Sequence, residues 1–274
     1  MEKLEAALAK AREARMGAKL GGDTAEPVLI DPRTVVRADW RALTEITISP
    51  ELARRNRIAA LLGGIDATPY DMLRSRAYRT MKEAGWTRVA VTSPNAACGK
   101  TTVSLNLALS LARQTELKIM LVDLDLRRPS LHKLLGCKPT HSVHEMLEGK
   151  VGFAETAVRI GENLAVAMNV TAARNPAELL HSDQSRAALD MIEAQFRPDI
   201  LIFDMSPMLA SDDNVGFLGN VNCALLVAAA ESTTLQSIDI CEKELAQLTN
   251  VLGIVLNKCR YSDNSAGYGY EAYE

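Results

Sequence analysis

The residues best suited to chemistry lie in segment 93–102, which reads Ser-Pro-Asn-Ala-Ala-Cys-Gly-Lys-Thr-Thr. An apolar run, 88–92, precedes it and a helix-like run follows it, so the order is strand, loop and helix. In a phosphate-binding loop, backbone N–H groups at a helix N-terminus surround the phosphates, a lysine reaches the β and γ oxygens, and the next hydroxyl binds Mg²⁺. Lys100 and Thr101 stand at those last two positions.

The loop departs from the usual G-x-x-x-x-G-K-S/T spacing, because Pro94 stands where the first glycine is expected. The interpretation therefore rests on Gly99-Lys100-Thr101 and on the flanking strand and helix. A Gly-Lys-Thr turn that merely opens an ordinary helix is the alternative. The residues expected to line a nucleotide are Asn95, Ala96, Ala97, Cys98, Gly99, Lys100, Thr101 and Thr102.

Carboxylates follow two later strand-like runs. Segment 119–122 leads into Asp123 and Asp125, and segment 200–203 leads into Asp204. Ligands of open α/β sheets bind at the carboxyl ends of parallel strands, so these acids are expected beside the loop. Mg²⁺ prefers oxygen ligands and keeps several waters, so we expect its ligands among Thr101, Asp123, Asp204 and phosphate oxygens. The alternative is that each aspartate caps the helix that follows it.

The composition excludes several classes of function. With 274 residues, 47% of them hydrophobic and 24% charged, the chain can bury one substantial core. Its five cysteines form no C-x-x-C pair, which predicts reduced thiols rather than disulfides or structural zinc. A net charge of −3 without a basic stripe argues against nucleic-acid binding. Segment 223–230, the longest apolar stretch, is far shorter than the roughly 20 residues of a membrane span.

Strand-like and helix-like patterns alternate along the chain, which predicts an α/β fold with a doubly wound, mostly parallel sheet of the P-loop NTPase type. The expected strands are 88–92, 118–123, 164–169, 199–204, 222–229 and 251–256. The expected helices are 51–62, 70–84, 100–113, 142–149, 176–195, 212–219 and 233–248, with Ser142 and Asn175-Pro176 as helix-start signals. We expect an N-terminal helix and linker over 1–50, one main domain over 51–260 and a flexible tail over 261–274.

Taken together, these segments resemble the bacterial tyrosine kinases of the capsular and exopolysaccharide type, which are built on a P-loop ATPase core. Segment 93–101 follows the family's loop apart from Ala96, Ala97 and Cys98, the last of which replaces a glutamate and places a thiol near the phosphates. Segment 119–127 matches the family's Asp-x-Asp-x-Arg motif in full. The family's third motif, Asp-Thr-Pro-Pro, corresponds to Asp-Met-Ser-Pro at 204–207. Segments 175–180 and 256–258 also look like family segments.

The resemblance implies an autophosphorylating protein-tyrosine kinase that uses ATP and Mg²⁺ and regulates exopolysaccharide or capsule polymerisation and export. Asp123 would accept the proton of the tyrosine hydroxyl, whose pKa is near 10, while Lys100 and Mg²⁺ neutralise the γ-phosphate. Asp204 would be the second acid near the metal, and Asp125 would assist Mg²⁺ or position the acceptor. Arg127 would orient Asp125 or contact a neighbouring subunit's phosphates. Asn257 would contribute to nucleotide binding.

The resemblance also implies self-assembly and a membrane partner. The expected autophosphorylation sites are Tyr261, Tyr268, Tyr270 and Tyr273. One subunit's tail would enter the next subunit's site in a ring, and added phosphate charge would dissociate it. The residues related to the family's oligomerisation helix are Asp71, Arg74, Arg76 and Arg79. A separate transmembrane protein, similar to a chain-length regulator, would activate the kinase and hold this cytoplasmic protein at the inner face of the plasma membrane.

Two other functions remain open at the level of sequence. A non-kinase ATPase switch of the partitioning or division-site class shares the loop and the sheet, but it usually carries a lysine where this chain has Asn95, and its membrane-binding members end in an amphipathic helix that this chain lacks. A subunit that binds nucleotide for regulation only is favoured by Pro94, by Cys98 and by segment 205–206.

Overall fold

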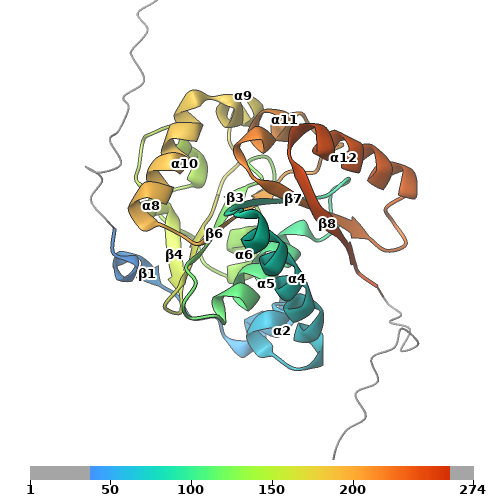
Figure 1. Cartoon of the computed structure of the whole chain (residues 1–274). Helices are drawn as coiled ribbons and strands as arrows, with labels where there is room; N and C mark the ends of the chain where they lie inside the picture. Colours follow the sequence, from blue (N-terminus) through green and yellow to red (C-terminus); the bar gives the residue numbers. More distant parts are fainter. Residues whose placement is uncertain (1–37, 260–274) are drawn as a thin grey trace, which may run out of the picture. The chain divides into compact units, whose positions relative to one another are not determined.

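The computed structural model describes residues 38–259. Within them an eight-stranded sheet runs in the order β1-β4-β5-β3-β6-β2-β7-β8 (Figure 1). Neighbouring strands pair parallel, except that β4 and β5 pair antiparallel. The strands are β1 (Thr44–Glu45), β2 (Arg88–Thr92), β3 (Ile119–Leu124), β4 (Ala157–Ile160), β5 (Leu164–Ala167), β6 (Ile200–Met205), β7 (Cys223–Ala229) and β8 (Asn250–Asn257). The predicted α/β class is confirmed.

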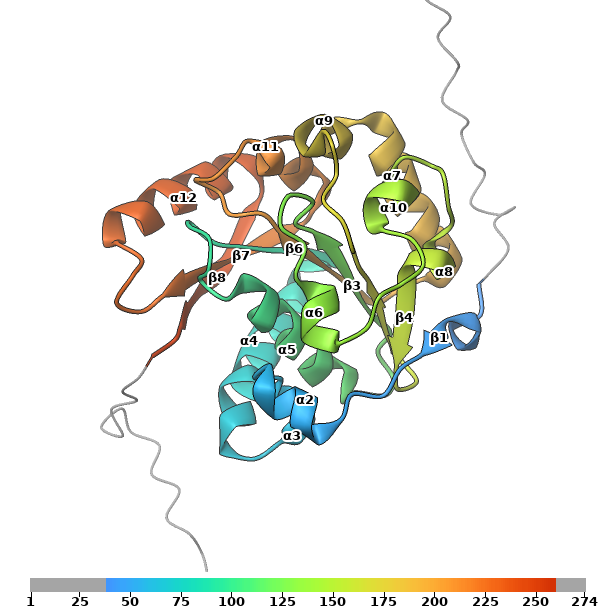
Figure 2. The same cartoon turned by 180° about the vertical axis from the view of Figure 1, so that it is seen from behind.

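Helices cover both faces of this sheet (Figures 1 and 2). The α-helices are α2 (Pro50–Arg55), α3 (Ala59–Leu62), α4 (Thr68–Ala84), α5 (Lys100–Ala112), α6 (Leu131–Leu135), α7 (Val143–Leu147), α8 (Phe153–Thr156), α9 (Pro176–His181), α10 (Asp183–Phe196), α11 (Asp213–Phe217) and α12 (Leu235–Leu248). Short 3₁₀ turns are η1 (Trp40–Ala42), η2 (Ile65–Ala67) and η3 (Leu218–Asn220).

Alternate residues of the central strand β3 enter two different apolar cores. Met120 and Val122 belong to the core shared with α7, α10 and α12, whereas Ile119 and Leu121 belong to the core shared with α5. Successive strand side chains point to opposite faces, so a strand that is covered on both sides reads as a continuous apolar run. That burial leaves the polar residues of the strand only at its carboxyl end.

The folded part begins earlier than the expected boundary at residue 51. Trp40 is 4% exposed, and its indole N–H donates to the Phe196 carbonyl at 2.8 Å. Strand β1 then joins the sheet beside β4. Neither β1 nor β4 was predicted from the sequence, because β1 has only two residues and β4 only four. One residue of β4 is the buried Arg159, which forms an ion pair with Glu45 at 2.7 Å. The boundary was misplaced because segments this short carry no detectable period.

Two expected helices are each broken into two. Segment 51–62 is interrupted at Arg57, whose φ of 57° is left-handed, and the chain turns there to bury Ile58 completely. Segment 176–195 is interrupted at Ser182, which is extended with ψ 145° and whose hydroxyl accepts from the Ser185 N–H as the N-cap of α10. A serine cap inside an amphipathic run can restart a helix, which the apolar period alone does not reveal. The signals at Ser142 and at Asn175-Pro176 are confirmed as the starts of α7 and α9.

None of the helices in residues 38–259 has the length and hydropathy that crossing a bilayer requires. The longest of them, α4, has 17 residues and carries charged side chains along its length.

Candidate functional site

The loop between β2 and α5 is curled by two left-handed residues. Ala97 has φ 63° and Gly99 has φ 89°. Alternation of left- and right-handed residues turns successive N–H groups inward and forms an anion-binding concavity. The Asn257 amide donates to the Cys98 carbonyl at 2.9 Å, and a Cβ added to Gly99 would lie 2.2 Å from its Nδ2. Glycine is therefore required at position 99. Asn257 contacts the loop, and its contribution to nucleotide binding stays a prediction.

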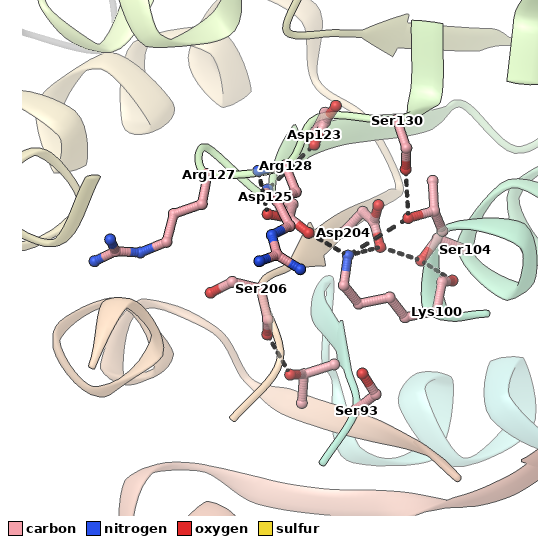
Figure 3. Close-up of polar contacts among 12 residues, drawn as sticks. Ser93, Lys100, Ser104, Asp123, Asp125, Arg127, Arg128, Ser130, Asp204 and Ser206 are labelled. Carbon is pink, nitrogen blue, oxygen red and sulfur yellow. Dashed lines mark hydrogen bonds and ion pairs between the residues drawn. The ribbon is translucent and has the colours of Figure 1, made fainter. Parts of the chain in front are cut away.

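Lys100 opens α5 and extends into a cluster of carboxylates (Figure 3). Its Nζ donates to Asp125 Oδ2 at 2.6 Å and lies 3.8 Å from Asp204 Oδ1. Burial opposes the charge on Lys100, but the negative charges of Asp204 and Asp125 outweigh it and raise the lysine pKa. Lys100 is therefore a buried, protonated cation held at the N-terminus of a helix, where phosphates bind.

Asp123 and Asp204 occupy paired positions on β3 and β6, and both are buried. Burial and the Asp204 charge raise the pKa of Asp123 well above its usual value. Burial likewise raises the pKa of Asp204, although Lys100 partly offsets it. Ser104, one turn after Lys100, donates to Asp204 Oδ1 at 3.2 Å. The site thus holds two adjacent acids whose pKa values are both raised, because burial and their mutual repulsion oppose the charged forms.

The oxygen atoms of the site fit Mg²⁺ held jointly with phosphate. Asp123 Oδ2 and Asp204 Oδ2 are buried without a hydrogen-bond partner. The Thr101 hydroxyl, which accepts from Ser130 Oγ at 3.2 Å, adds a third hard oxygen. In residues 38–259 no group of three or more His, Cys, Asp or Glu side chains is arranged to hold a metal ion. A cation here would therefore depend on phosphate oxygens and water for most of its shell.

Asp125 is fixed by its neighbours, but Arg127 is not among them. The Asp125 backbone N–H donates to Asp123 Oδ1 at 3.1 Å, and Asp125 Oδ1 accepts from the Arg128 backbone N–H at 3.0 Å. Arg127 instead forms a two-pronged ion pair with Asp213, at 2.7 and 2.8 Å, and its side chain leads away from Lys100 (Figure 3). The expectation that Arg127 orients Asp125 is therefore wrong in this structure, because Asp213 on α11 occupies its guanidinium.

The Cys98 thiol is directed into the protein. The residue is 2% exposed and belongs to the apolar core around α5. Its Sγ lies 3.5 Å from the Thr233 hydroxyl, in the turn between β7 and α12. A thiol in that position is shielded from solvent, which removes the structural basis for a reactive thiol beside the phosphates. Asn95, Ala96 and Ala97 form the exposed side of the loop.

The residues expected to form an oligomer contact divide into two groups. Asp71 binds α5 internally, because it accepts from Ser110 Oγ at 2.6 Å and pairs with Arg113 at 2.7 Å. Arg74 donates to the Ser110 carbonyl at 3.3 Å. Arg76 and Arg79 are exposed. Assembly through this helix stays a prediction, and the four tail tyrosines lie outside the described residues.

Several polar residues of the site were missed by sequence analysis. Ser104 could have been found, because it lies four residues after Lys100 and therefore on the same helix face. Ser130 and Asp213 lie in loop and helix segments without a local signal. Asn169 donates to the Asp123 carbonyl at 2.7 Å and supports the end of β3. Its position follows from the packing of β5 beside β3, which no pattern near residue 169 encodes.

The fold and the site define a P-loop nucleotide-binding domain. More specifically, the chain belongs to the CobQ/CobB/MinD/ParA nucleotide-binding domain family, whose model matches residues 89–268. This membership supports nucleotide binding at the loop that carries Lys100.

Relatives place the chain beside bacterial tyrosine kinases, which confirms that resemblance. The tyrosine-protein kinase ptk of Acinetobacter johnsonii is 31% identical over 183 residues, which are 66% of this chain and 24% of that protein. The tyrosine-protein kinase etk of Escherichia coli strain K12 is 30% identical over 187 residues, 68% of this chain and 25% of that protein. The solved kinase domain of Escherichia coli ETK has a TM-score of 0.68 and 26% identity, covering 85% of this chain and 89% of that domain. The chain thus spans about a quarter of the length of these two curated relatives.

Proposed function

We propose that this chain is the catalytic domain of an ATP-dependent protein-tyrosine kinase that phosphorylates itself and regulates exopolysaccharide or capsule polymerisation and export. The observation that carries the proposal is the convergence of Lys100, Asp123 and Asp204 in one buried cluster at the start of α5. The names of the relatives add the acceptor residue type. A triphosphate bound to the loop would meet the lysine first and the two acids behind it.

Binding of ATP requires Lys100 to change partners. In the structure its ammonium is committed to Asp125 at 2.6 Å. A nucleotide in the loop offers the β and γ oxygens instead, which carry more negative charge. Thr101, Asp123 and Asp204 would hold Mg²⁺, and that ion would supply charge neutralisation at the transferred phosphoryl group. Asp125 would then be free to position the acceptor.

Asp123 is the proposed base for the tyrosine hydroxyl. A tyrosine with a pKa near 10 transfers its proton more readily to a carboxylate of raised pKa than to an ordinary one. Burial raises the pKa of Asp123 in the required direction. The Asn169 hydrogen bond to the Asp123 backbone carbonyl at 2.7 Å holds the end of β3 from which this side chain extends.

The proposed acceptors are Tyr261, Tyr268, Tyr270 and Tyr273, which follow β8 in the chain. Each phosphate adds roughly −1.5 to −2 charges, so modification would make a tail that already carries three acidic residues and no lysine or arginine much more strongly anionic. We place the kinase in a homo-oligomer in which tails are phosphorylated between subunits. A transmembrane activator would hold the assembly at the inner face of the plasma membrane.

The test is incubation of the purified full chain with Mg-ATP, followed by detection of phosphotyrosine, of ADP release and of bound nucleotide. We expect phosphotyrosine, and we expect Lys100→Met or Asp123→Ala to abolish it without loss of fold by circular dichroism. Deletion of residues 261–274 should remove most labelling. Mixing the Lys100→Met chain, as acceptor, with the tail-deleted chain, as enzyme, should restore labelling between subunits.

The other outcomes identify the other functions. Hydrolysis without phosphotyrosine would support an ATPase switch, and binding without turnover would support a regulatory nucleotide-binding subunit. Normal labelling of both the Lys100→Met and the Asp123→Ala chains would exclude the proposed mechanism.

A further inference from the structure

The loop that follows β3 is attached to the phosphate loop at two points. Asp125 binds Lys100 Nζ at 2.6 Å, and Ser130 donates to the Thr101 hydroxyl at 3.2 Å. Both contacts go to the residues that would meet the terminal phosphates and the metal ion. The four residues between Asp125 and Ser130 are therefore held at the edge of the phosphate site, with little freedom to move away from it.

Two of those four residues are consecutive arginines with different environments. The Arg127 guanidinium forms a bidentate ion pair with the Asp213 carboxylate. The Arg128 backbone N–H is fixed on Asp125 Oδ1 at 3.0 Å, whereas its guanidinium is exposed and has no hydrogen bond or ion pair with any part of the chain that the structure describes. Figure 3 shows that this guanidinium turns toward the side of Asp125 and Ser206, and that the Arg127 guanidinium turns away from them.

A cation besides Lys100 and the proposed Mg²⁺ would have a role in phosphoryl transfer at this site. Among residues 38–259, the one buried cation near Asp123, Asp125 and Asp204 is Lys100, whose Nζ lies 2.6 Å from Asp125 and 3.8 Å from Asp204. A triphosphate adds further negative charge, and in phosphoryl transfer this charge spreads over the equatorial oxygens of the group that moves. A guanidinium matches two of those oxygens at once, which an ammonium does not. Arg128 is the side chain at the edge of the site that is available for this contact.

We propose that Arg128 is a catalytic residue that donates to the γ-phosphoryl oxygens during transfer. This inference rests on the proposed kinase function. In the step, the tyrosine oxygen forms a bond to the γ-phosphorus, and the bond from that phosphorus to the β–γ bridging oxygen breaks. The electron pair of the broken bond leaves on ADP, and the tyrosine proton passes to Asp123. Arg128 stabilises the charge on the three oxygens that remain bound to phosphorus.

The experiment measures binding of Mg-ADP to the full chain with and without aluminium fluoride, which mimics the transferring phosphoryl group. In the wild type we expect aluminium fluoride to tighten Mg-ADP binding. Arg128→Ala should bind Mg-ADP alone with the affinity of the wild type. In the presence of aluminium fluoride its affinity should be about tenfold or more below that of the wild type, because arginines in this role contribute about 10³ or more to the rate. Arg128→Lys should recover only part of that affinity, since one ammonium replaces a two-pronged contact.

Matched variants separate this role from a loss of fold or of general charge. Arg55→Ala removes an exposed arginine on α2 and should keep the full tightening. Arg128→Ala should also lower kcat for phosphotyrosine by about 100-fold or more with little change in KM for ATP. The proposal would be overturned if Arg128→Ala kept the full tightening by aluminium fluoride, or if Arg127→Ala lost the tightening and Arg128→Ala did not. It would also be overturned if aluminium fluoride did not tighten Mg-ADP binding in the wild type.

Failure of the kinase function gives a different result. A wild type that makes no phosphotyrosine but binds aluminium fluoride with Mg-ADP, and loses that binding in Arg128→Ala, would support the role of Arg128 in phosphoryl transfer to another acceptor. It would overturn only the assignment of tyrosine as the substrate.

Discussion

Asp123 and Asp204 are paired neighbours in the parallel register of β3 and β6, and each keeps one buried carboxylate oxygen without a hydrogen-bond partner. Two such groups destabilise the fold when both are charged, because neither is solvated and they repel each other. Lys100, 3.8 Å from Asp204, offsets only part of this repulsion. The arrangement favours binding of a further cation over stability of the empty site.

Asp123→Asn should therefore stabilise the nucleotide-free protein. The pKa of Asp123 is raised on folding, so its contribution to the free energy of unfolding is largest below the usual carboxyl range and decreases as the pH rises through the folded pKa. We expect the variant to gain about 1–2 kcal/mol at neutral pH, within the usual range for an unsatisfied buried polar group. The gain should vanish below about pH 4, where the wild-type carboxyl is protonated in both states. Urea unfolding at several pH values measures it, with the exposed Asp66→Asn as control.

Asp125→Asn should strengthen binding of ADP in the absence of Mg²⁺. The substitution removes the carboxylate that competes with phosphate for Lys100 at 2.6 Å. If the released pair is worth about 1 kcal/mol, the affinity rises about fivefold. Titration calorimetry in EDTA measures it, and weaker binding by the variant would contradict the idea that Asp125 and phosphate share the lysine.

Gly99→Ala should abolish nucleotide binding and destabilise the fold. The new Cβ would lie 2.2 Å from Asn257 Nδ2, and the φ of 89° adds backbone strain. We expect a loss of about 2–4 kcal/mol in the free energy of unfolding. Gly85→Ala is the matched control, because Gly85 also has a left-handed φ, 68°, but has nothing within 4 Å of its Cβ position, so it should lose only about 1 kcal/mol. Equal losses in both variants would show that the Asn257 contact is unimportant.

Asp71→Asn should destabilise the monomer before it affects assembly. Hydrogen bonds from Ser110 and then from Arg113 lower the pKa of Asp71 below its usual value. Its stabilising effect is therefore present at neutral pH and is lost as the pH falls through the folded pKa. We expect the variant to lose about 1 kcal/mol at pH 7, with the difference from wild type shrinking below about pH 4. Thermal unfolding measures the loss, with Asp66→Asn again as control.

Assembly can be separated from this effect at Arg76 and Arg79, which are exposed on the same helix. If α4 forms the oligomer contact, Arg76→Ala with Arg79→Ala should dissociate the oligomer in sedimentation velocity at unchanged melting temperature. An unchanged sedimentation coefficient would place the contact elsewhere.

Most of the sheet could be predicted because its strands are buried on both faces and read as apolar runs. The run at 88–92 matched β2 in full, and the run at 199–204 differed from β6 by one residue at each end. The short strands β1 and β4 could not be predicted, since their stability comes from partners on other segments. The break at Ser182 was missed although its contacts are local, because the serine that caps α10 lies inside a continuous amphipathic run. The same limit applied to Asp71, which the resemblance placed in an oligomer contact and the fold placed against α5.

The sequence by itself determined that a lysine-bearing loop and several strand-end acids would meet, because the alternation of strands and helices brings the carboxyl ends of parallel strands to one edge. Only the tertiary structure decided that the Arg127 guanidinium is bound to Asp213, whereas the Arg128 guanidinium has no partner among the described residues. The pair between Arg127 and Asp213 joins residues 86 positions apart, and it depends on how α11 packs beside the loop after β3. Local periodicity specifies which face of a strand or helix is buried, but contacts between distant polar side chains depend on where whole elements come to lie.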